Sequence, residues 1–163
     1  MLYIRTAKMS DLDKILKIYE AARSFMASVG NPSQWSDSYP PKELLVEDIA
    51  SEKLYCVESE GVVEGVFYFS VENDPTYAEI DGKWLDDEPY AVIHRVASSG
   101  RVKGVLSSAV RFAPDIFPNI KIDTHNDNLV MQAALSKLGF EKCGTIRLEN
   151  GDPRIAYQLV VNK

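Results

Sequence analysis

The sequence predicts a single mixed α/β (α+β) domain in which about four helices flank a sheet of about six or seven strands. Apolar residues recur at helical spacing in some segments, whereas shorter segments rich in Val, Ile, Phe and Tyr are bounded by turn residues. No repeat, low-complexity tract or linker divides the 163 residues, and this length suits one compact core. We therefore expect one domain that spans residues 1–163.

The first half of the chain alternates helix and strand patterns. Gly30-Asn31-Pro32 stops the first helix, and Glu60-Gly61 joins two strands into a hairpin. A loop with two aromatic residues and two prolines, 34–41, separates the two helices. The expected elements are a strand over 2–7, an amphipathic helix over 11–27, a helix over about 42–51, and strands over 54–59 and 62–71.

The second half begins with a polar segment, 72–89, that we expect to be a long loop, and long loops in compact domains are often functional. Pro114 is expected to end one helix, and Gly139 closes another. The expected elements are strands over 90–97, 120–123, 141–148 and 154–161, and helices over about 101–113 and 128–138.

Composition excludes several classes of protein. The net charge of −6 argues against non-specific binding of nucleic acid. No apolar run is long enough for a membrane span, and the early charges do not fit a signal peptide, so we expect a cytoplasmic protein without a membrane partner. Cys56 and Cys143 form no disulfide framework, and two histidines cannot form a His-rich metal site.

Segment 123–127 contains carboxylates and an imidazole, which are metal ligands. A loop that enters a capped helix explains these residues better, so we expect no metal.

The turn Arg101-Val102-Lys103-Gly104 lies between an expected strand and an expected helix. A helix N-terminus attracts anions, and a glycine lets a ligand approach the backbone, so the turn could hold a phosphate. The alternative is an ordinary helix start with two solvated cations. A Walker loop and a dinucleotide fingerprint are both excluded, because the required glycines and the Gly-Lys-Ser/Thr are missing.

Two motifs in order resemble the GNAT superfamily of acetyl-CoA-dependent N-acetyltransferases. The first is the turn 101–106, which matches a Gln/Arg-x-x-Gly-x-Gly/Ala pattern except at Leu106. The second is Asn128 followed by a helix that ends in Leu138-Gly139-Phe140. The chain is especially similar to a bacterial branch with Gln34-Trp35 and Tyr39-Pro40, Ile93-His94-Arg95, Asp123-Thr124-His125, Asp127-Asn128 and Arg154 to Tyr157. The resemblance implies a mostly antiparallel sheet and acetyl-CoA as co-substrate.

The resemblance also implies the cofactor site. Backbone groups of Val96 and Ala97 would pair with the pantetheine arm, and Asn128 and Met131 would line the channel near the thiol. Met131 could instead be core, and Asn128 could also be an N-cap. The residues implied to hold the pyrophosphate are Arg101, Val102, Lys103, Gly104, Val105 and Leu106.

Acetyl transfer needs a group that removes a proton from the amine and a group that protonates the leaving thiolate. The family's usual tyrosine acid is replaced by Leu135, which leaves Tyr68 and Tyr157 as phenols without an assigned place. His94 is the candidate base, since a neutral imidazole accepts protons near neutral pH. A buried structural histidine is the alternative. Strand alternation places Val96 on the face of His94 and turns Arg95 to the opposite face, in a structural role.

Aromatic residues in the two long loops are candidates for an acceptor pocket, because they suit cationic or aromatic amines. They could equally anchor the loops. The candidates are Trp35, Tyr39 and Trp84, and Tyr77 belongs to the same loop as Trp84. The expected function is transfer of an acetyl group to the amine of a small molecule or peptide by direct attack, in a monomer or homodimer. The alternative is a GNAT-fold module that binds acyl-CoA without catalysis.

Overall fold

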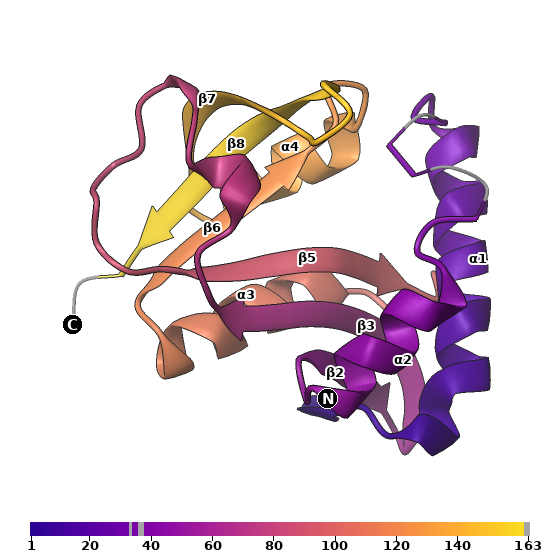
Figure 1. The fold of residues 1–163 in the computed structure, drawn as a ribbon. Helices are drawn as coiled ribbons and strands as arrows, with labels where there is room; N and C mark the ends of the chain where they lie inside the picture. Colours follow the sequence, from indigo (N-terminus) through magenta and orange to yellow (C-terminus); the bar gives the residue numbers. More distant parts are fainter. Residues whose placement is uncertain (33, 36–37, 162–163) are drawn as a thin grey trace.

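The protein folds into one twisted sheet with helices on both faces (Figure 1). The structure is a computed structural model, and it describes residues 1–32, 34–35 and 38–161. Two 3-10 turns, η1 (Met9–Asp11) and η2 (Pro75–Tyr77), accompany the longer elements. These are β1 (Leu2–Thr6), α1 (Leu12–Ser28), α2 (Lys42–Ala50), β2 (Leu54–Ser59), β3 (Val62–Val71), β4 (Asp81–Gly82), β5 (Ala91–Ser98), α3 (Val105–Ile116), β6 (Asn119–Thr124), α4 (Leu129–Lys137), β7 (Glu141–Arg147) and β8 (Pro153–Val160).

Within the described residues the sheet has eight strands in the order β1-β2-β3-β5-β6-β8-β7-β4. All neighbouring strands run antiparallel except β5 and β6, which run parallel. The expected six or seven strands omit β4, a two-residue strand inside the segment that we expected to be a loop. Its Gly82 passes directly over Gly144 of β7, and a Cβ on either glycine would collide with the other strand's backbone. Because neither glycine has a Cβ, the two backbones can come close enough for β4 to pair with β7.

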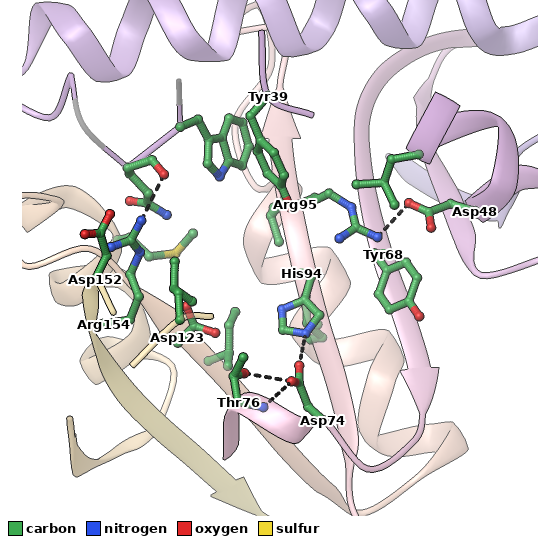
Figure 2. A pocket seen from close by; sticks show the side chains of 18 of the residues that line it. Tyr39, Asp48, Tyr68, Asp74, Thr76, His94, Arg95, Asp123, Asp152 and Arg154 are labelled. Atoms are coloured by element: carbon green, nitrogen blue, oxygen red, sulfur yellow. Dashed lines mark hydrogen bonds and ion pairs between the residues drawn. The ribbon is translucent and has the colours of Figure 1, made fainter. Parts of the chain in front are cut away.

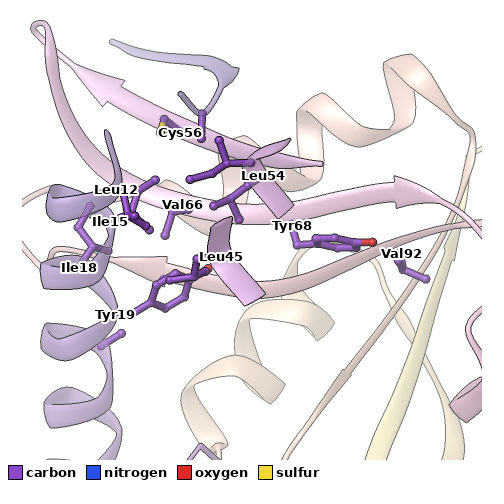
Figure 3. Packing of buried hydrophobic residues seen from close by; sticks show 14 of the residues in the cluster. Leu12, Ile15, Ile18, Tyr19, Leu45, Leu54, Cys56, Val66, Tyr68 and Val92 are labelled. Atoms are coloured by element: carbon purple, nitrogen blue, oxygen red, sulfur yellow. The ribbon is translucent and has the colours of Figure 1, made fainter. Parts of the chain in front are cut away.

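Two hydrophobic cores cover the two faces of the sheet. Side chains of α1 and α2 pack with β2 and β3 in the first core, where Ile15, Tyr19 and Leu45 are fully buried (Figure 3). Side chains of α3 and α4 form the second core on the opposite face, around Ala109 and Leu135. Apolar residues at helical spacing on each helix therefore meet the sheet, as the sequence pattern indicates. None of the helices in the described ranges combines the length and the hydropathy of a membrane span.

Local turn chemistry confirms one expected connection and corrects another. Glu60 and Gly61 have φ of 51° and 79°, so both central residues of the β2–β3 hairpin are left-handed, as a tight hairpin turn requires. Pro114 does not end its helix, because α3 continues to Ile116. The amide of Phe117 bonds the carbonyl of Ala113 and closes the last turn, so Pro114 removes only one bond of the ladder.

The centre of the sheet is open at one end. β5 pairs with β6 only at Ala91 and Val92, and the two strands then separate. On its other side β5 pairs with β3, but the register slips between Val66 and Tyr68, beside Arg95. Arg95 has φ of 53°, a left-handed conformation that is uncommon for a residue with a side chain. The buried hydroxyl of Tyr19 donates to the carbonyl of Arg95 at 2.7 Å and holds this bulge.

Candidate active site

A polar cavity of about 690 Å³ lies where β5 and β6 separate. Loop residues Trp35 and Tyr39 line it together with Tyr68 of β3 (Figure 2). Many of its other lining residues carry ionisable side chains, with carboxylates in the majority. These are Glu47, Asp48, Glu72, Asp74, His94, Arg95, Asp123, Asp152 and Arg154.

His94 is held by a carboxylate from the loop after β3. Its Nε2 lies 2.8 Å from Oδ2 of Asp74, while Oδ1 of Asp74 accepts bonds from the amide and the hydroxyl of Thr76. The amide of Asp74 donates to the hydroxyl of Tyr90 at 2.8 Å. Burial acts to raise the pKa of Asp74, but the bonds from His94 and Thr76 outweigh it and lower this pKa to about 2. Asp74 is therefore an ionised acceptor that fixes the imidazole.

Arg95 lies on the same side as His94, contrary to the expected alternation. The bulge at Arg95 interrupts the two-residue period, so both side chains line the cavity. The guanidinium of Arg95 reaches Asp48 of α2 at 2.6 Å and lies 4.5 Å from the ring centroid of Tyr68. Burial raises the pKa of Asp48, and the charge of Arg95 offsets part of this effect. The pair joins α2 to the bulge.

The opposite wall comes from β8 and the end of β6. Arg154, which is 6% exposed, donates to the backbone carbonyls of Pro153 and Gln34. Asp123 accepts a bond of 2.6 Å from the hydroxyl of Tyr77, whose ring centroid lies 6.0 Å from that of His94. Figure 2 shows Arg154, Asp152 and Asp123 across the cavity from Arg95 and Asp48.

A second, apolar cavity of about 360 Å³ adjoins the first along α1, α4 and the end of β5. Met26, Val96 and Met131 line both cavities, so the two spaces meet at these side chains. β6 no longer pairs with β5 beyond Val92, so the edge of β5 is open there to an extended ligand arm. The combined space can hold one ligand in an apolar groove and a second in a polar cavity.

The groove runs toward the basic turn at the start of α3. Gly100 and Gly104 have φ of 85° and 92°, which only glycine adopts at little cost, and no atom lies within 4 Å of a Cβ built at Gly100. The first amides of α3 have no acceptor inside the helix. The side chain of Arg101 turns back to β3, where its Nε donates to Glu64 at 3.1 Å. Backbone amides, more than the Arg101 charge, therefore form this end of the groove.

Comparison with solved structures identifies the fold. A GNAT-family acetyltransferase from Streptococcus agalactiae is 30% identical over 99% of this chain and 96% of its own, with a TM-score of 0.90. The chain belongs to the GNAT family of acetyltransferases. A putative acetyltransferase from Staphylococcus aureus is 28% identical over 98% of this chain and 99% of its own, with a TM-score of 0.72.

A third solved structure shares the GNAT fold at lower identity. It is a putative acetyltransferase from Salmonella typhimurium with its cofactor acetyl-CoA, 16% identical over 100% of this chain and 95% of its own, with a TM-score of 0.63. No protein-family model and no curated protein matches the sequence.

The residues that the GNAT resemblance assigns to the cofactor divide into two sets. Those that line the apolar groove are Val96, Ala97, Val105, Leu106, Asn128 and Met131. Those in the turn that precedes α3 are Arg101, Val102, Lys103 and Gly104. Asn128 is also the N-cap of α4, because its Oδ1 accepts the amide of Met131 at 3.0 Å. Met131 also packs against the second core.

Trp84 does not line the polar cavity, although we expected it beside Trp35 and Tyr39 in an acceptor pocket. It lies against Tyr77, and its Nε1 donates to the carbonyl of Tyr77 at 3.0 Å. Lys121 of β6 places its ammonium 4.0 Å from the Trp84 ring and 3.9 Å from the ring of Tyr90. This cation–π contact pins the loop that follows β3 to the sheet, so Trp84 anchors the loop. Trp35 and Tyr39 do line the cavity, whereas Ser36 and Asp37 of the same loop lie outside the described residues.

The phenols and thiols are also placed. Tyr157 and Leu135 are buried in the second core, whereas Tyr68 lines the cavity and donates to Glu72.

Cys56 is fully buried, and desolvation raises its pKa to about 12. Burial also raises the pKa of Cys143. Neither thiol lines either cavity. Among the described residues no group of three or more His, Cys, Asp or Glu side chains is arranged to hold a metal.

Asp74 and Asp48 have no signal in the sequence. Asp74 lies in a loop and Asp48 in a helix, next to Glu47, and each is 20 or more positions from its partner on β5. Arg154 is visible only as part of a motif shared with a bacterial branch. Spatial proximity across the sheet is what reveals these three residues.

Removing the carboxylate of Asp48 tests the pair that holds the bulge. We expect Asp48→Ala to lower the free energy of unfolding by about 3 kcal/mol, because the Arg95 guanidinium is then buried without a counter-charge. Glu43→Ala changes an exposed carboxylate on the same helix and is expected to cost no more than about 1 kcal/mol. Urea unfolding measures both. Equal, small losses would show that Arg95 does not depend on Asp48.

Proposed function

We propose that this GNAT protein transfers the acetyl group of acetyl-CoA to the primary amine of a small molecule or peptide. The observation that carries the proposal is the placement of an Asp74–His94 pair in a polar cavity that opens into an apolar groove. The groove suits the thioester arm, and the polar cavity suits the acceptor. Both reactants are then held together for direct transfer.

The groove fits an acyl-CoA on three features of this chain. Its lining is largely apolar, as a pantetheine arm and methyl group require, and the open edge of β5 at Val96 and Ala97 supplies backbone partners. The unpaired amides at the start of α3, with Lys103 beside them, suit a pyrophosphate. The similar fold from Salmonella typhimurium was solved with acetyl-CoA, which agrees with this use. When bound, acetyl-CoA supplies an activated thioester carbonyl.

His94 is suited to act as the general base. An ionised Asp74 can only accept a hydrogen bond, so it selects the tautomer in which Nε2 carries the proton. In that tautomer Nδ1 has a free lone pair, which accepts a proton from the acceptor ammonium or amine. Asp74 acts through His94 and is a positioning residue. The resulting imidazolium is stabilised by the same carboxylate.

The bond changes need no covalent intermediate on the protein. The acceptor nitrogen gives a proton to His94 and forms a bond to the carbonyl carbon, and the carbon–sulfur bond breaks with its electron pair on sulfur. Water that enters the cavity protonates the leaving sulfur, because Leu135 offers no acid and the hydroxyl of Tyr68 is hydrogen-bonded to Glu72. The hydroxide that remains takes up the proton that His94 received, so the imidazole is neutral again and the products are the amide and the free thiol. Cys56 and Cys143 do not serve as acyl carriers, since both lie outside the cavities and both have raised pKa values.

The test of this function is turnover. We expect acetyl-CoA to release free thiol in the presence of at least one member of a panel of amino acids, amino-acid amides, polyamines, aromatic amines and short peptides. Release is measured with a thiol reagent, against a reaction without amine. Binding of acetyl-CoA without release by any amine would favour the alternative, a non-catalytic acyl-CoA-binding module, which the replacements Leu106 and Leu135 make conceivable.

The cofactor site is tested by adding a carboxylate to the turn. We expect Gly104→Glu to reduce coenzyme A binding below calorimetric detection, since the side chain would occupy the phosphate position and repel it. Gly61→Glu is the matched control, because Gly61 has a similar φ of 79°, has open space around a built Cβ, and lines neither cavity. Both variants carry comparable backbone strain. Unchanged affinity in a folded Gly104→Glu variant would refute this assignment.

The base is tested by the pH dependence of single turnovers. We expect the wild-type rate to fall toward acid pH as His94 becomes protonated, and His94→Ala to lose this acid limb and roughly a hundredfold or more in rate. Asp74, with its pKa lowered to about 2, stays ionised throughout the assay range and cannot produce the limb. Coenzyme A affinity should barely change.

His125→Ala is the control for this experiment, because His125 lies in the loop between β6 and α4 and lines neither cavity. It should keep both the rate and the acid limb. If His94→Ala instead keeps a near-normal rate with an unshifted acid limb and loses only thermal stability, His94 is structural.

A further inference from the structure

Arg154 differs from the other cationic or basic side chains of the polar cavity. Arg95 is paired with Asp48, and His94 is paired with Asp74. Arg154 is 6% exposed and lines the cavity, yet no carboxylate among the described residues forms an ion pair with it. Its hydrogen-bond partners in the described part of the chain are two backbone carbonyls, those of Pro153 and Gln34. Two of the five N–H donors of the guanidinium are thus used, and the other three have no acceptor among residues 1–32, 34–35 and 38–161.

A buried cation without a counter-ion is costly unless a ligand supplies the opposite charge. The two carbonyl bonds hold the guanidinium in place, so little side-chain entropy remains to be lost when an anion binds. Its planar donors match the two oxygens of a carboxylate. The position of Arg154 in the cavity wall places these donors beside the acceptor.

Strand register places Arg154 on the same face of the sheet as His94. Arg154, Ala156 and Gln158 alternate on β8, and Asp123 pairs with Ala156 while Lys121 pairs with Gln158. Across β6, Lys121 pairs with Val92, two residues before His94. At Val92 two strand spacings, about 10 Å, separate the backbones of β5 and β8, and beyond Val92 β5 and β6 diverge. The side chains of His94 and Arg154 both line the cavity that this divergence opens, so one acceptor bound there lies between them.

We propose that the acceptor is a zwitterionic, amino-acid-like amine whose carboxylate binds Arg154 while its amine faces His94. The inference rests on the proposed acetyl transfer and names its substrate class. Carboxylates outnumber guanidinium groups in the cavity wall, so the ammonium form of the amine is attracted to the same space. The same excess disfavours a phosphate dianion, because Asp152 and Asp123 lie on the wall that holds Arg154.

Matched substrate pairs test the proposal. The common L-amino acids are compared with their α-amides and with the amines left after decarboxylation, by thiol release from acetyl-CoA. We expect kcat/KM for the preferred amino acid to exceed that for its amide by roughly 10- to 100-fold, the usual worth of a charge-assisted bidentate contact. An enzyme that acetylates the amide or the decarboxylated amine equally well overturns the proposal.

Variants assign the preference to Arg154. Arg154→Gln should lower kcat/KM for the amino acid to near that of its amide and leave the amide value nearly unchanged, whereas Arg154→Lys should retain part of the preference. Arg147→Gln, which removes an exposed arginine of β7, should keep the wild-type preference. Unchanged coenzyme A affinity shows that each variant is folded. Equal loss for both substrates in Arg154→Gln and Arg154→Lys would make Arg154 structural and overturn the proposal.

A binding measurement separates this inference from the proposed function. With coenzyme A bound, N-acetyl amino acids represent the product and need no catalysis. We expect a panel of them to raise the melting temperature of the wild type more than their N-acetyl amides do, and Arg154→Gln to abolish the difference. If no amine is acetylated but the acids still stabilise the wild type selectively, the proposed function fails and the carboxylate site stands. Equal shifts for acids and amides overturn the site.

Discussion

The separation of β5 from β6 is the constraint on which the site depends. The strands pair only at Ala91 and Val92, although both continue for several residues beyond. Backbone groups past this point must find other partners, and the bulge at Arg95 is stabilised by the hydroxyl of Tyr19 from the first core. The gap forms the polar cavity on one side and the apolar groove along the free edge of β5. A sheet that continued its pairing would have neither.

Buried charge is the second constraint, because the polar cavity is lined by ionisable groups that are partly removed from water. Two of the basic side chains have a carboxylate partner within the protein: Arg95 is ion-paired with Asp48, and His94 is hydrogen-bonded to Asp74. Each pair also joins separate elements, since Asp48 belongs to α2 and Asp74 to the loop after β3. The charges thereby position the cavity walls, at a desolvation cost that the ion pairs only partly offset. Within the described residues Arg154 has no carboxylate partner and donates to two backbone carbonyls instead.

The side chain of Gln34 connects the walls of the polar cavity and of the apolar groove. The Oε1 atom of Gln34 accepts bonds from Asn31, Asn128 and Thr124, at 3.0, 2.8 and 3.3 Å. These bonds tie the loop after α1, which covers the polar cavity, to the end of β6 and to the cap of α4, which borders the groove. A displacement of α4 would therefore also displace the loop after α1, because Gln34 is hydrogen-bonded to Asn128. The position of the polar cavity relative to the apolar groove depends on the Gln34 amide as well as on the sheet.

Local sequence determined most elements of this protein. Helical periodicity predicted three of the four long helices of the described chain, because each of these buries one apolar stripe. The hairpin was predicted by two segments rich in Val, Phe and Tyr that are separated only by Glu60-Gly61. The two GNAT motifs indicated the family. Tertiary structure alone decided that Arg95 faces the cavity, that Trp84 anchors a loop, and that Asp74 meets His94. Each of these depends on a bulge or on a contact between distant segments, and no pattern of neighbouring residues encodes which side chains such a contact brings together.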